Sequence, residues 1–145
     1  MGDSTVVYLA SRSPRRRELL QQIGVAFDVI DVDIEECRSQ GEAADAYVAR
    51  LALEKARAGR DALPEDRVLP VLGADTAVVA GDSILGKPHD RDAADAMLAL
   101  LSGRTHRVLT AVALVADGEA VRVSSSNVTF RTLTGSERAA YWATG

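Results

Sequence analysis

The feature that most constrains this chain is a short stretch near its start, residues 9–20, with the sequence LASRSPRRRELL. The branched and aromatic residues before and into it, 6–10, predict a short buried strand. Ser13 stands where a helix N-cap belongs, and Pro14 occupies the first helical position, where its missing N–H costs nothing. Apolar residues follow at helical spacing, up to a glycine that can end the helix: Leu19, Leu20, Ile23 and Gly24. The stretch therefore predicts a strand, a polar turn and a helix.

The start of that helix carries three arginines, Arg15, Arg16 and Arg17. Free N–H groups, the positive end of the helix dipole and the guanidinium forks together favour a bound anion, and phosphate is the natural candidate. The alternative is a solvated helix face without a ligand. Exposed arginines in a first turn oppose the dipole at roughly 0.3–1 kcal/mol each, a cost that a bound anion would remove. The residues alone leave both interpretations open.

Composition narrows the class of protein. A chain of 145 residues suits one domain, residues 1–145, with its own core. A formal net charge of −4 argues against a general nucleic-acid binder. The single cysteine, Cys37, fits a reducing compartment, and we find neither a membrane-length apolar run nor a signal peptide. We therefore expect a cytoplasmic protein that binds no nucleic acid and no membrane.

The rest of the chain alternates between strand-like and helix-like patterns. We expect a helix at residues 42–59, with Tyr47 in its apolar stripe and Arg50 mostly off it. A buried strand at 68–72 should end at residues 73–76, which places Asp75 at the carboxyl end of a central strand, where open α/β sheets keep their chemistry. The other expected strands are 27–32, 76–80, 84–85, 107–116 and 120–133, and the other helices are 90–101 and one opened by a capping box at 134–137. Hairpins among strand–helix units predict an α/β fold with a mixed sheet.

The opening stretch resembles the signature of the Maf family, nucleotide pyrophosphatases also described as septum-formation inhibitors. The resemblance continues in the family's order through Glu35-Glu36 and through residues 50–56, 72–76, 81–88 and 101–106. It implies the elongated fold shared by Maf proteins and inosine-triphosphatase-like enzymes, with a nucleotide cleft between two lobes. It also implies a homodimer.

The resemblance implies the reaction as well: a nucleoside triphosphate, with dTTP and UTP preferred, is cleaved to the monophosphate and pyrophosphate, as housecleaning of the nucleotide pool. Such a reaction needs cationic groups on the phosphates, a divalent cation (Mg²⁺ or Mn²⁺) and a carboxylate. Asp75 matches the family's catalytic acid/base, and the expected metal ligands are Asp75 and Glu35. The expected substrate-binding residues are Ser11, Ser13, Arg15, Arg16, Lys55, Thr76 and Lys87.

One departure from the family pattern concerns the end of the chain. Family members usually continue past the equivalent of residues 142–145 into an Asp-Lys-Ala-Gly and a Gln-Gly stretch, so the C-terminal part of the family domain is absent here. We therefore expect the 145-residue chain alone to be weakly active or inactive and prone to self-association.

The alternative function is a nucleotide-binding regulator of cell division without turnover. A nucleic-acid binder using residues 15–17 is disfavoured by the overall acidity.

Overall fold

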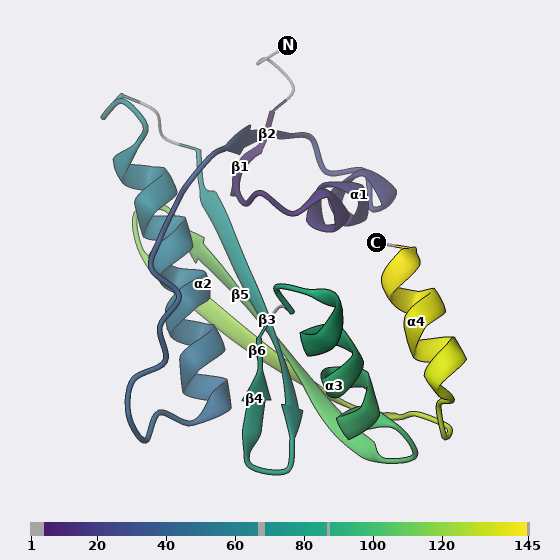
Figure 1. The fold of residues 1–145 in the computed structure, drawn as a ribbon. Coiled ribbons are helices and arrows are strands. Elements are labelled where there is room, and N and C mark those ends of the chain that lie inside the picture. The colour runs from purple at the N-terminus through teal and green to yellow at the C-terminus, as the bar shows by residue number, and fades with distance from the viewer. Residues whose placement is uncertain (1–4, 67–68, 87, 145) are drawn as a thin grey trace. The chain divides into compact units, whose positions relative to one another are not determined.

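The computed structural model describes residues 5–66, 69–86 and 88–144, and within them it has four helices and six strands. The elements are β1 (Val7–Ala10), α1 (Pro14–Gln22), β2 (Phe27–Ile30), α2 (Ala44–Asp61), β3 (Val71–Ala80), β4 (Ser83–Leu85), α3 (Arg91–Leu101), β5 (Thr105–Val115), β6 (Glu119–Thr129) and α4 (Gly135–Ala143). The strands form a mixed sheet in the order β2-β1-β3-β5-β6, with β4 paired to β3, which confirms the expected fold class (Figure 1). The chain divides into two compact units, residues 1–75 with 110–124 and residues 76–109 with 125–145.

The first unit begins with parallel strands joined by helices. β1 pairs in parallel with β2, Val7 lying opposite Phe27, and with β3, Leu9 lying opposite Leu72. Parallel neighbours need a crossover connection, and α1 and α2 supply the two crossovers. The predicted start of α1 is confirmed, because the Ser13 side chain caps it and Pro14 is its first residue.

Helix α2 packs unusually close to β3, and two glycines allow it (Figure 1). A Cβ on Gly73 would stand 2.7 Å from the backbone nitrogen of Ala56 and closer still to the carbonyl oxygen of Ala52. A Cβ on Gly59 would stand 2.8 Å from Cγ1 of Val71. The helix therefore lies with its backbone against the strand, and its buried residues form the core of this unit: Val48, Leu51, Ala52, Ala56 and Gly59.

The prediction that a strand ends at residues 73–76 is wrong. β3 runs without interruption through Val71–Ala80, so Asp75 lies in the middle of a ten-residue strand. Gly73 marks a close approach of a helix rather than a turn, a distinction that its sequence context does not reveal. Its neighbour β1 does end there, since its pairing with β3 stops at Leu72. The carboxyl end of a parallel strand therefore still lies near Asp75.

The second unit contains the β3–β4 hairpin, one end of β5, one end of β6 and two helices. β4 returns antiparallel to β3, with Ile84 opposite Val79, as the Gly81-Asp82 turn predicts. Asp90 caps α3, and Thr134 with Glu137 forms the predicted capping box at the start of α4. These two helices lie side by side, and an ion pair of 2.7 Å joins Arg138 of α4 to Asp95 of α3 (Figure 1). Among the described residues, no helix is long and apolar enough to cross a membrane.

Candidate active site

The turn between β1 and α1 is held together by its own serines. The buried Ser11 hydroxyl accepts a hydrogen bond of 3.0 Å from the Ser13 backbone N–H. The Ser13 hydroxyl in turn accepts one of 3.4 Å from the Arg16 backbone N–H. Both serines therefore shape the N-terminus of α1, which presents Arg15 at the surface and Arg16 half-buried. This is the geometry that the sequence predicts for an anion-binding helix end.

Lys55 of α2 lies at the centre of the charged residues in this unit. Its Nζ stands 2.9 Å from Oδ1 of Asp75 on β3 and 2.9 Å from Oε1 of Glu36 in the loop after β2. It also donates to the carbonyl oxygen of Ala74 at 3.3 Å. The Lys55 and Asp75 side chains are only 15% and 11% exposed, whereas Glu36 is 51% exposed. Two carboxylates from separate elements are thus bridged by one ammonium group.

Burial and charge act in opposite directions on this cluster. Burial raises the pKa of Asp75 above its ordinary value, while the hydrogen bond and charge of Lys55 limit the rise. Burial likewise lowers the pKa of Arg16, and the charges of Asp75 and Glu36 act against that shift. The Arg16 guanidinium is therefore within electrostatic reach of both carboxylates. A buried carboxylate with a raised pKa is a stronger base than an exposed aspartate, as proton abstraction from water requires.

The structure brings Glu36, the residue after the expected metal ligand Glu35, onto Lys55. Glu35 is exposed, and its carboxylate accepts a long hydrogen bond of 3.7 Å from the Cys37 thiol. The sequence pattern does not distinguish two adjacent acidic residues of a loop as partners for a lysine. Only the path of the backbone decides which of them meets the lysine.

The two remaining expected residues are placed differently. Thr76 follows Asp75 on β3 and is exposed, whereas Asp75 is buried. Successive residues of a strand point to opposite faces, so these two side chains do not share a face of the sheet. Lys87 lies outside the described residues. The residues that the structure gathers are therefore Arg16, Glu36, Lys55 and Asp75.

The carboxylates of this cluster suit a hard divalent cation. Across residues 5–66, 69–86 and 88–144, no group of three or more metal-binding side chains stands close enough to hold an ion alone. Mg²⁺ rarely needs three protein ligands, because proteins usually bind it through one or two carboxylates together with substrate phosphates and water. Asp75 and Glu36, which already share one cation in Lys55, are such a pair. The donor set fits a cation that arrives with a phosphate substrate.

Two residues of α2 that the sequence analysis did not place in a site contact the loop that carries Glu36. The Tyr47 hydroxyl donates to the Glu36 carbonyl oxygen at 3.2 Å, and Arg50 Nη2 donates to the Cys37 carbonyl oxygen at 2.7 Å. Tyr47 was expected only in the apolar stripe of the helix. The available sequence signal was the spacing of Arg50 from Glu54, four residues on, which predicts an ion pair but not the loop contact.

Comparison with known proteins identifies the family of the chain. The family model described as "Maf-like protein" matches residues 6–145. A dTTP/UTP pyrophosphatase of Alkalilimnicola ehrlichii is 54% identical over 142 residues, which cover 96% of this chain and 70% of that protein. One of Escherichia coli O157:H7 is 52% identical over 143 residues, covering 97% of this chain and 71% of that protein. In structure, the chain is similar to a nucleoside-triphosphatase (dITP/XTP pyrophosphatase) of Mycobacterium abscessus. The superposition covers 85% of this chain and 73% of the other, with a TM-score of 0.53 at 20% sequence identity. This likeness supports a shared fold. Sequence signature, fold and relatives agree, and the chain belongs to the Maf family.

Proposed function

We propose that this protein, in its fully assembled form, hydrolyses dTTP and UTP to the nucleoside monophosphate and pyrophosphate. The observation that carries the proposal is the bridging of Asp75 and Glu36 by Lys55 beside the arginine-bearing start of α1. Relatives about half identical over nearly the whole chain carry the name dTTP/UTP pyrophosphatase. A buried base beside several cations is what hydrolysis of a phosphoanhydride requires.

In the proposed reaction, a water molecule attacks the α-phosphorus and the bond from that phosphorus to the bridging oxygen breaks. Asp75 accepts the proton of the water, and pyrophosphate leaves with the bridging oxygen. Lys55 and the arginines of the first turn of α1, Arg15 and Arg16, neutralise charge on the phosphate oxygens. Thr76 and Lys87 stay in the proposal as further substrate-binding residues. Each group acts by position and charge, and none forms a covalent bond to the substrate.

The proposed cofactor is Mg²⁺ or Mn²⁺, held by Asp75 together with Glu36. The ion, when bound, withdraws charge from phosphate oxygens as a Lewis acid. Glu35 stays in the proposal as a metal ligand, and Glu36 is added because it shares Lys55 with Asp75.

Removal of divalent cations should strongly lower the activity. We expect pyrophosphate release from dTTP to fall more than about tenfold in EDTA, because charge on the phosphate oxygens is then less well neutralised. Release should return when Mg²⁺ or Mn²⁺ is added in excess. The measurement is a coupled pyrophosphate assay, with the coupling enzyme checked separately in EDTA. Full activity in EDTA would rule out the proposed cofactor.

A nucleotide panel tests the proposed substrates. We expect kcat/KM for dTTP and UTP to exceed that for GTP by at least about tenfold, because buried polar groups that pair with one base are left unpaired by another. The panel should include dCTP and ATP at the same cation concentration. Similar values for GTP and dTTP would contradict the substrate assignment. Tight binding of dTTP without pyrophosphate release would favour the regulatory alternative instead.

A further inference from the structure

The loop between β2 and α2 carries Glu36 but has almost no regular structure of its own. Residues 31–39 contain neither helix nor strand, and Glu36 is 51% exposed at its side chain. An exposed carboxylate on such a loop has many accessible positions. Its place on Lys55 therefore depends on whatever fixes the backbone at Glu36 and Cys37.

Two side chains of α2 hold that backbone at consecutive carbonyl groups. Tyr47 binds the carbonyl oxygen of Glu36, and Arg50 binds that of Cys37, at 3.2 and 2.7 Å. Both come from the helix that also carries Lys55. The helix thus supplies the lysine and also holds the loop that brings the carboxylate to it.

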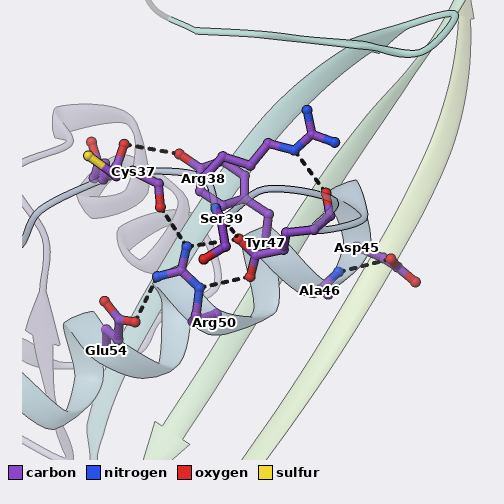
Figure 2. Close-up of polar contacts among 10 residues, drawn as sticks. Cys37, Arg38, Ser39, Asp45, Ala46, Tyr47, Arg50 and Glu54 are labelled. Carbon is purple, nitrogen blue, oxygen red and sulfur yellow. Dashed lines mark hydrogen bonds and ion pairs between the residues drawn. The ribbon is translucent and has the colours of Figure 1, made fainter.

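Several neighbouring groups bind the guanidinium of Arg50, and Figure 2 shows its contacts with Cys37 and Glu54. Its Nε and Nη2 donate to the two carboxylate oxygens of Glu42 at 2.8 and 2.9 Å, and its Nη1 donates to Glu54 at 2.9 Å. The guanidinium also lies over the ring of Tyr47, 5.6 Å from its centre. Glu42 in turn accepts the backbone N–H of Ser39 at 3.0 Å. Arg50 therefore ties the middle of the loop to its end and both to the helix.

We propose that Arg50 is a positioning residue of the reaction, which with Tyr47 holds residues 36–42 so that the Glu36 carboxylate lies on Lys55. The inference rests on the proposed function, in which Glu36 acts beside Asp75. A lysine cannot replace Arg50 in this role, because one ammonium cannot reproduce the planar fork that meets Glu42, Glu54 and Cys37 together. Arg50 and Glu42 form a bidentate pair in which the Glu42 side chain is only 12% exposed, so stability and catalysis have to be measured separately in each variant.

The first test is Arg50→Lys, which keeps the charge and removes the fork. We expect kcat for pyrophosphate release to fall about 10–100-fold, since misplacing a reacting group by about 1 Å can cost 10²-fold. KM is measured alongside kcat, because a rise in KM with unchanged kcat would place the effect of Arg50 on ground-state binding and not on the reaction. Tyr47→Phe, which removes only the bond to Glu36, should lower kcat a few-fold. Thermal melting of both variants checks that they fold.

A matched control is available on the same helix. Arg57 makes the same kind of fork, with Nε and Nη2 each 2.7 Å from a carboxylate oxygen of Glu119 on β6. Arg57→Lys should leave kcat within about twofold, since surface ion pairs contribute little. Unchanged kcat in Arg50→Lys, or an equal loss in Arg57→Lys, overturns the proposal.

A double-mutant cycle distinguishes positioning from a general structural role. If Arg50 acts through Glu36, Arg50→Lys should lower kcat much less in a Glu36→Gln background than in the wild type. Losses that simply multiply would overturn the proposal.

Hydrogen exchange tests the same contacts without substrate. Backbone amides of residues 36–42 should exchange faster in Arg50→Lys and Tyr47→Phe than in the wild type or Arg57→Lys. Unchanged exchange in Arg50→Lys overturns the proposal. If the wild-type chain released no pyrophosphate from any nucleotide, the proposed function would fail, and the exchange rates alone would decide whether Arg50 holds the loop.

Discussion

Replacing Asp75 with asparagine should lower kcat for pyrophosphate release by about 10²–10⁴-fold, the usual cost of losing a general base. Asparagine keeps the size and shape of the side chain but cannot accept the proton of the attacking water. Asp82→Asn is the matched control, because Asp82 is an exposed residue of the turn between β3 and β4. Turnover of Asp75→Asn within a few-fold of the wild type would show that Asp75 is not the base.

The pH profile gives the same prediction a second measurement. Burial raises the pKa of Asp75, so this carboxylate becomes protonated at a higher pH than an exposed aspartate. Activity that needs the ionised form is therefore present above the raised pKa and lost as the pH falls through it. We expect the acid limb of kcat/KM to lie above the usual aspartate range and to be absent from the residual activity of Asp75→Asn. An acid limb retained in the variant would assign it to another group.

The start of α1 was predictable because its determinants are local. Ser13, Pro14 and the arginines follow one another in the sequence, and the cap forms as their order predicts. The contact between Lys55 and Asp75 joins residues twenty positions apart; the family resemblance assigned a role to each residue but did not predict their contact. Helical or strand periodicity carries no information about such a pair.

The sequence does not predict which of the adjacent acids Glu35 and Glu36 contacts Lys55. Both are exposed loop acids, and nothing in their own sequence context distinguishes them. The choice is made by Tyr47 and Arg50, which hold the loop from a different element. Helical periodicity predicts Tyr47 among the apolar residues of the helix. It does not predict the hydrogen bond that the Tyr47 hydroxyl donates to the Glu36 carbonyl oxygen.

Gly73 misled the prediction of β3 for a related reason. Glycine before polar residues is typical of a turn, but here it makes room for the backbone of α2. The strands and helices around it were predicted in the right order, while the continuity of β3 depended on a contact with a helix more than ten residues earlier.

Gly73→Ala should therefore destabilise the protein by about 1–3 kcal/mol or more, the cost of overpacking a core. The added Cβ would meet the backbone of α2 at Ala56 and Ala52, and no flexible side chain is there to move aside. Either the helix shifts outward or β3 distorts. Because Lys55 directly precedes Ala56, a shift of the helix also moves the ammonium group relative to Asp75. Urea unfolding measures the first effect, and kcat of the folded fraction measures the second.

Gly118→Ala is the control for this last substitution. Gly118 lies in the bend between β5 and β6, its φ is not positive, and a Cβ there would have no neighbour within 4 Å. Its free energy of unfolding should stay within about 0.5 kcal/mol of the wild type, as for most surface substitutions. Equal stability of Gly73→Ala and the wild type would contradict the close packing of α2 on β3. A destabilised Gly73→Ala whose folded fraction keeps full kcat would instead show that the placement of Lys55 tolerates a shift of its helix.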